Sequence, residues 1–206
     1  MELIQAYSTE ILKGSAMTFS SKVKDELLNV ETIKPCCILA ECYGLLLFGR
    51  GFSAGEVYIS TENRNVALRY KELVERFTEN PCNVSESASG KIKVSVGNKQ
   101  DRLAVLNAFG YNGKERTRRL NWANISEDCC IGSFLRGVFL ACGTVNSPEK
   151  NYHLEFVVPH MYLSRDLQKF LSDNDMAAKE VTRNGAYVLY FCLLYTSPSP
   201  RDMRRS

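Results

Sequence analysis

Six of the eight cysteines form two sets that could bind a soft metal ion or supply a nucleophile. The sets are Cys36, Cys37 and Cys42, and Cys129, Cys130 and Cys142. Adjacent Cys-Cys pairs lack the Cys-x-x-Cys spacing of common structural zinc sites. No base is evident to activate a thiol. We therefore favour cysteines that act as small buried hydrophobic residues, and we expect no catalytic residue, no metal ion and no cofactor.

The two histidines, His153 and His160, lie on and just after a predicted strand, in a spacing that matches no familiar metal or triad pattern. A disulfide scaffold is not expected, because 206 residues can bury a core without covalent staples. The first residues lack the apolar run of a secretory signal. No stretch is apolar over the roughly 18–20 residues that a membrane span needs. We therefore expect a cytoplasmic protein with reduced cysteines and no membrane contact.

The two cysteine sets belong to an internal repeat. The segment from Cys36 to Arg50 (CCILAECYGLLLFGR) aligns without a gap with the segment from Cys129 to Gly143 (CCIGSFLRGVFLACG). Both cysteines, the isoleucine and the central glycine are identical between the copies. Self-similarity at a fixed offset indicates a duplicated structural unit.

Each apolar helix of the repeat is followed by the same order of elements. Strands are expected at 56–61 and 152–158, amphipathic helices at 66–77 and 163–171, and further strands or hairpins at 91–96 and 186–191. Gly90 and Gly185 precede the last strands, where hairpin turns favour glycine. The sequence thus predicts an α+β fold of two pseudo-symmetric α-β-β-α-β-β halves, joined through residues 97–126. A further helix, capped by Ser20 or Ser21, is expected before them.

The central glycines predict how the two halves meet. Glycine costs about 1 kcal/mol relative to alanine inside a helix, and a helix that is apolar on most sides must be buried on most sides. We therefore expect the two helices to pack against each other at a pseudo-two-fold axis, where missing side chains allow close approach. The interface residues would be Gly44, Leu45, Gly137, Val138 and Ala141. The alternative is two buried helices with incidental glycines.

The segment LRGVFLACG, from Leu135 to Gly143, resembles the LAGLIDADG motif of homing endonucleases, and CYGLLLFGR, from Cys42 to Arg50, resembles it more weakly. From about Thr18 to Phe191 the chain resembles the bacterial WhiA family of regulators, associated with sporulation and cell division. That resemblance is carried by SSKVKDELL, by KPCC and the following AE, and by CCIGSFLRGVFLACGTVNSPEKNYHLEF. It implies a degenerate endonuclease-like N-terminal domain and, missing here, a C-terminal helix-turn-helix domain that carries much of the sequence-specific DNA binding.

Domain boundaries follow from the repeat and this resemblance. Residues 1–16 are expected to be a disordered extension, and residues 17–33 an N-terminal helix. The first LAGLIDADG-like repeat with its connector spans 34–126, and the second, truncated, spans 127–192. Residues 193–206 are expected to be a non-native tail, because CLLYTSPSPRD resembles translated adapter sequence.

The resemblance also bears on catalysis. LAGLIDADG nucleases place an acidic residue near the end of each motif helix, and the two acids hold divalent metal at the scissile phosphates. The equivalent positions are Gly49 and Cys142, whose side chains offer no oxygen ligand for a hard cation. We therefore expect no DNA cleavage. The resemblance implies a nucleoid-associated, DNA-binding transcriptional regulator linked to division and chromosome segregation.

DNA contact must come from local basic clusters, since the net charge is only +3. The candidates on or beside the hairpins and in the connector are Lys91, Lys93, Lys99, Lys114, Arg116, Arg118, Arg119 and Arg183. The connector group, flanked by Tyr111 and Trp122, is equally consistent with a solvated linker. The expected partner is DNA, with a protein partner in transcription regulation as a further possibility. The alternative function is a scaffold that binds a protein or ligand and does not touch DNA.

Overall fold

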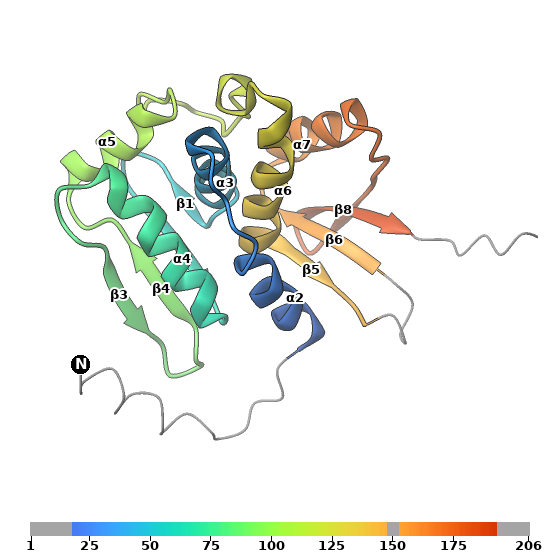
Figure 1. The fold of residues 1–206 in the computed structure, drawn as a ribbon, viewed down its shortest axis with the longest axis horizontal. Coiled ribbons are helices and arrows are strands. Elements are labelled where there is room, and N and C mark those ends of the chain that lie inside the picture. The colour runs from blue at the N-terminus through green and yellow to red at the C-terminus, as the bar shows by residue number, and fades with distance from the viewer. Residues whose placement is uncertain (1–17, 148–152, 193–206) are drawn as a thin grey trace, which may run out of the picture.

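Two helices, α3 (Pro35–Leu47) and α6 (Asp128–Cys142), lie side by side at the centre of the molecule, with one sheet on each side (Figure 1). The structure is a computed structural model that describes residues 18–147 and 153–192. No helix in these two ranges is long and apolar enough to cross a membrane. The expected segments 1–16 and 193–206, and Tyr152 of an expected strand, lie outside the described residues.

The two halves repeat one order of elements. After α3 come β1 (Gly51–Phe52), β2 (Val57–Thr61), α4 (Arg64–Val74), β3 (Asn83–Glu86) and β4 (Ile92–Ser95). After α6 come β5 (Gly143–Val145), β6 (His153–Val158), α7 (Met161–Asp173), β7 (Lys179–Arg183) and β8 (Ala186–Cys192). The antiparallel sheets have matching orders, β1-β2-β4-β3 and β5-β6-β8-β7. The expected α+β fold of two α-β-β-α-β-β halves is confirmed.

Strand alternation separates two faces in each sheet. In β4, Ile92 and Val94 are buried beneath α4, whereas Lys93 points to the opposite, exposed face. In β6, Phe156 and Val158 are buried on the side of α7. Gly90 and Gly185 turn the β3–β4 and β7–β8 hairpins with positive φ of 77° each, a conformation that disfavours other residues. Each sheet therefore buries one face under a helix and leaves the other face open.

In the α3–α6 contact, the glycine of each helix packs against equivalent positions of the other helix. A Cβ added at Gly44 would lie 2.5 Å from the Phe134 carbonyl oxygen and 2.8 Å from Val138 N. One added at Gly137 would collide with the Glu41 carbonyl oxygen and lie 2.9 Å from Leu45 N. Phe134 and Val138 occupy the positions in the second repeat that Glu41 and Leu45 occupy in the first. Backbone therefore meets backbone at both glycines. Ala141 is half-buried against the core.

Three local features differ from the sequence expectations. The N-terminal helix α2 (Phe19–Leu28) is capped by Thr18, whose Oγ1 accepts from Ser21 N at 3.2 Å, so the expected Ser20 or Ser21 cap is wrong. The cap lies just N-terminal to both serines, which are already helical. No element was expected in the connector, yet it contains α5 (Lys99–Ala108) and the 3-10 helix η2 (Trp122–Ile125). A second 3-10 helix, η1 (Glu75–Phe77), replaces the expected end of α4.

Candidate nucleic-acid interface

The carboxyl ends of α3 and α6, the two helices of the repeat, are each bound by a basic side chain from another segment of the chain. Arg118 Nη1 donates to the carbonyl oxygens of Leu47, at 3.2 Å, and Gly49, at 2.9 Å. Lys24 Nζ donates to the Leu140 carbonyl oxygen at 3.1 Å, two residues before Cys142. Cations at a helix C-terminus stabilise its unpaired carbonyl groups and dipole. Each of these helix ends is therefore capped by a positively charged side chain.

The two caps are exchanged between the repeats. Lys24 lies in α2, ahead of the first motif helix, and caps the second; Arg118 lies in the connector, ahead of the second, and caps the first. Burial lowers the pKa of Lys24, an effect that the nearby Cys142 partly opposes. Burial also raises the pKa of the Cys142 thiol to about 12, so this side chain stays neutral at ordinary pH. A neutral thiol beside a cation is a poor place for a divalent metal ion.

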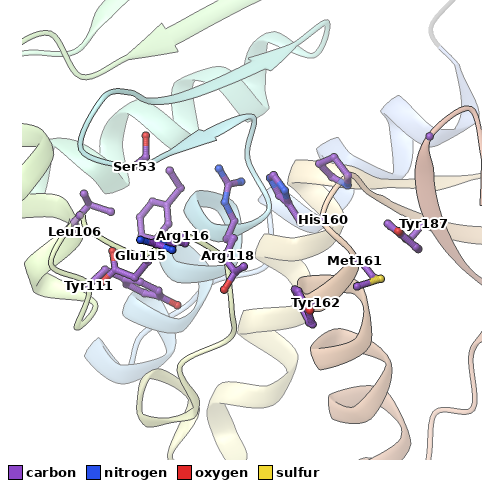
Figure 2. A pocket seen from close by; sticks show the side chains of 15 residues that line it. Ser53, Leu106, Tyr111, Glu115, Arg116, Arg118, His160, Met161, Tyr162 and Tyr187 are labelled. Atoms are coloured by element: carbon purple, nitrogen blue, oxygen red, sulfur yellow. The ribbon is translucent and has the colours of Figure 1, made fainter.

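A cavity of about 410 Å³ lies beside Arg118, between the two halves. Figure 2 shows Ser53, Tyr111 and Arg116 on one side of Arg118, and His160, Tyr162 and Tyr187 on the other. Burial lowers the pKa of His160, and the neighbouring Arg118 lowers it further. With two arginines and several hydroxyl groups in its lining, this cavity suits a phosphate or another polar anionic group.

The eight predicted DNA-binding residues fall into two structural groups. Three of them are held by partners within the chain: Arg118 by the backbone of α3, Arg119 by Asp166 at 2.7 and 2.8 Å, and Arg183 by Glu155 at 2.8 Å. The other five are exposed, as Arg119 and Arg183 also are: Lys91, Lys93, Lys99, Lys114 and Arg116. Within the described ranges, no carboxylate lies within 4.0 Å of Lys93, Lys99, Lys114 or Arg116.

Among the predicted residues, Lys93 has the position best suited to contact a DNA groove or the DNA phosphate backbone. Its Nζ lies 4.2 Å from the centre of the Tyr58 ring, on the open face of the first sheet. Lys91, at the hairpin beside it, lies 4.0 Å from Glu62. On the second sheet, the open face presents Glu155, which accepts from both His153 and Arg183. Among the predicted DNA-binding residues, those without an ion pair therefore lie on the first sheet and in the connector, whereas Arg183 of the second sheet is paired. The second sheet also carries Lys179 of β7, which is exposed and has no carboxylate of the described residues within 4.0 Å.

Several important side chains were missed by sequence reasoning. Lys24 lies within the SSKVKDELL segment that supported the resemblance, but nothing local marks it as a helix cap. Asp166 and Glu155 neutralise predicted DNA-binding arginines from 47 and 28 residues away. Glu41, on α3, binds Arg69 and Arg136 in the protein interior. These pairings depend on tertiary packing, and the repeat alone could not reveal them.

Four of the six cysteines in the two sets come together. The Sγ atoms of Cys36, Cys37, Cys129 and Cys130 all lie within 4.8 Å of one another at the amino ends of α3 and α6. Cys42 is buried, and Cys142 lies at the far end of α6. Among the described residues, this is the one group of histidine, cysteine and acidic side chains arranged closely enough to hold a metal ion.

Comparison with known proteins shows where this architecture recurs. Residues 131–192 match the family described as the WhiA LAGLIDADG-like domain. The probable cell division protein WhiA of Alkaliphilus metalliredigens is 30% identical over 190 residues, which cover 84% of this chain and 60% of the relative. The probable cell division protein WhiA of Ruminiclostridium cellulolyticum is 31% identical over 185 residues, which cover 84% of this chain and 59% of the relative. The chain thus spans about 60% of the length of these relatives.

Solved structures agree on the fold. The crystal structure of the N-terminal LAGLIDADG domain of DUF199/WhiA matches with a TM-score of 0.64 at 21% identity, covering 88% of this chain and 89% of that domain. The crystal structure of the homing endonuclease I-DmoI in complex with DNA and Mn matches with a TM-score of 0.53 at 14% identity. The match covers 75% of this chain and 89% of I-DmoI. Fold, sequence and family match agree: the chain contains the N-terminal LAGLIDADG-like domain of the WhiA family.

Proposed function

We propose that this chain is the N-terminal portion of a DNA-binding transcriptional regulator of the WhiA type, which acts in cell division, chromosome segregation and sporulation without cleaving DNA. The observation that carries the proposal is the open face of the first sheet, where Lys93 lies over Tyr58 with no carboxylate of the described residues within 4.0 Å. Free cations on such a face can neutralise phosphates and fix a protein on the duplex.

The fold supports the same surface. I-DmoI, which shares this architecture, is a homing endonuclease solved with DNA and Mn. Arg116 lines the cavity between the halves, close to Arg118. We infer that Lys93 and Arg116, together with Lys91, Lys99 and Lys114, supply phosphate contacts. Arg118 and Arg119 act mainly by holding the connector in place.

The absence of cleavage is part of the proposal. Gly49 and Cys142 provide no carboxylate at the helix ends, and Arg118 and Lys24 place positive charge there. A divalent ion at this place would lack carboxylate ligands from these two positions and would meet two cations. Incubation with supercoiled DNA and magnesium should leave the DNA uncut, and a specific nick or cut would contradict this part of the proposal.

DNA affinity measured against salt tests the binding itself. The chain should bind a mixed-sequence duplex at low salt, with affinity that falls steeply as salt rises. Lys93→Ala and Arg116→Ala should each reduce the slope of log affinity against log salt by about 1, if each side chain makes one phosphate contact. The control is Lys169→Ala, because Lys169 is an exposed lysine on α7, paired with Asp173 and away from the open sheet face.

One observation favours the alternative of a scaffold that binds a protein or ligand. The cavity of about 410 Å³ between the halves offers tyrosine and arginine side chains to a small polar ligand. No binding to the duplex at low salt, or a slope unchanged in both variants, would favour that function for this chain.

A further inference from the structure

Cys36, Cys37, Cys129 and Cys130 form a pseudo-symmetric thiol cluster at the amino ends of the two motif helices. Cys36 and Cys129 occupy equivalent positions of the repeat, each eight residues before the glycine at which the helices touch. Their Sγ atoms are 3.8 Å apart, and the Sγ atoms of Cys36 and Cys37 are 4.0 Å apart. All four sulfur atoms lie within 4.8 Å of one another.

We propose that these four thiolates bind one zinc ion at the pseudo-two-fold axis, fastening the amino ends of α3 and α6 together. Zinc bonds to sulfur at about 2.3 Å in tetrahedral sites, which places neighbouring sulfur atoms about 3.8 Å apart. The Cys36–Cys129 separation already has this value, and the Cys36–Cys37 separation differs from it by a few tenths of an ångström. The cluster needs small side-chain movements to meet the geometry of a four-sulfur site.

The position of the pairs in the first helical turn explains how adjacent cysteines can share one ion. Successive side chains on a helix diverge by about 100°, and the preceding turn normally restricts their rotamers. Cys36 and Cys129 are the second residues of their helices, so no preceding turn stands in the way. Each pair can therefore direct both sulfur atoms to a centre that lies between the helices.

The local charge also suits such a site. Four thiolates and one Zn²⁺ carry a net charge of −2, and each helix amino end contributes about half a positive charge. Binding releases the four thiol protons to the solvent. The Cys37 thiol, which donates to the Cys129 carbonyl oxygen at 3.1 Å, gives up that hydrogen bond when it becomes a ligand. Soft thiolate ligands in a tetrahedral set select zinc over magnesium or calcium.

This site is distinct from the metal position of the nucleases. That position lies at the carboxyl ends of the motif helices, beside Gly49 and Cys142, where Arg118 and Lys24 now bind. The thiol cluster lies at the opposite ends of the same helices, at their first residues. The sequence-based expectation of no metal ion rested on the adjacency of the cysteines. The packing of α3 against α6 brings one pair from each repeat to a common centre.

Metal analysis of the whole chain tests the proposal. Purified under reducing conditions without a chelator, the chain should contain about one zinc ion per molecule. The double variant Cys36→Ser, Cys129→Ser should lose nearly all of it, and Cys142→Ala, whose sulfur lies at the other end of α6, should keep it. Cys129 is exposed and Cys36 half-exposed, so both serines should be accommodated in the fold.

A spectroscopic readout separates binding from folding. Cobalt added to the metal-free wild-type chain should give the visible absorption bands of tetrahedral thiolate coordination, and the double variant should give none. A chelator should lower the melting temperature of the wild type and leave that of the double variant unchanged. A reduced, folded wild-type chain that takes up neither zinc nor cobalt overturns the proposal. So does copper or iron in place of zinc, or a native disulfide among these four cysteines.

Discussion

Glu41 accepts a hydrogen bond from Arg136 Nη2 at 2.6 Å, joining α3 to α6 inside the protein. The side chains of Glu41 and Arg136 are only 1% and 8% exposed. Arg69 of α4 binds the same carboxylate, with Nε at 2.8 Å from Oε1. Arg136 also donates to the Val30 carbonyl oxygen and to Thr32 Oγ1, so this one carboxylate ties together the segment before α3 and three helices.

Removing that carboxylate should be strongly destabilising. Glu41→Gln leaves the buried Arg136 without a counter-charge, whereas Arg69 keeps its ion pair with Glu72. Breaking a buried pair on one side costs about 3–5 kcal/mol. Urea unfolding measures the change. The matched control is Glu72→Gln, because Glu72 also binds Arg69, at 3.1 Å, but is exposed. An exposed pair contributes about 0–1 kcal/mol. Equal effects of the two substitutions would show that the buried pair does not stabilise the helix contact.

Two glycines of α6 should respond in opposite directions to alanine. At Gly137 the new methyl group would meet the backbone of Glu41 and Leu45, which cannot move aside as a side-chain end can. We expect Gly137→Ala to destabilise the fold by about 1–3 kcal/mol, the cost of overpacking. Gly132 lies in the same helix with nothing within 4 Å of an added Cβ. Gly132→Ala should therefore stabilise the fold by up to about 1 kcal/mol.

Thermal or urea unfolding of Gly137→Ala and Gly132→Ala, compared with the wild type, measures both changes in stability. A Gly137→Ala chain as stable as the wild type would mean that α3 and α6 do not approach at this glycine. The same experiment on Gly44→Ala should give a similar loss, because the two glycines make reciprocal contacts.

The repeat could be predicted from sequence because its signals are local. Gly44 and Gly137 recur at one offset, and Gly90 and Gly185 mark equivalent hairpin turns. The helix α5 escaped prediction because its apolar residues follow one another and do not mark a single helix face. The pairing of Glu41 with Arg136 joins residues 95 positions apart. Such contacts follow from tertiary packing, so no sequence spacing could have predicted them.

Basic residues show the same limit on the prediction of sites. Sequence clustering selected Arg118 and Arg119 as readily as Arg116, since all lie in one connector. Their roles differ because Arg118 binds the end of α3 and Arg119 binds Asp166, whereas no carboxylate of the described residues lies within 4.0 Å of Arg116. Local charge thus predicts where a basic surface lies, but only packing determines which of its members are free.

Acid should weaken the fold through Asp101. The pKa of this carboxyl is lowered, first by the hydrogen bond from Glu79 N, at 3.0 Å, against an opposing effect of burial, and further by donors of Asn80 and Asn98. A lowered folded-state pKa contributes stability that is present above the unfolded value of about 3.9 and is lost as pH falls through the folded value. Asp101→Asn should therefore be less stable than the wild type at pH 7, with a difference that shrinks in acid.

Urea unfolding of both chains between neutral and acid pH measures that difference. Asp173→Asn serves as the control, because Asp173 is exposed and bound only to Lys169 within the described part of α7. A difference between wild type and Asp101→Asn that stays constant down to acid pH would show that the carboxylate form of Asp101 does not stabilise the fold.

Arg116 and Arg118 offer a test that separates DNA contact from helix capping. Arg118→Met removes two hydrogen bonds to the carboxyl end of α3 and leaves the buried Leu47 and Gly49 carbonyl groups without this donor. The expected loss of stability is about 1–3 kcal/mol. Arg116→Met changes an exposed side chain in the same connector, and its effect on stability should stay within about 0.5 kcal/mol.

The salt dependence of DNA binding should show the reverse order. Arg116→Met should lower the slope of log affinity against log salt by about 1, because it removes a phosphate contact. Arg118→Met, measured at a temperature where the variant is fully folded, should leave the slope close to that of the wild type. A lower slope for Arg118→Met with unchanged stability would instead assign Arg118 to the DNA-binding surface and remove it from the cap of α3.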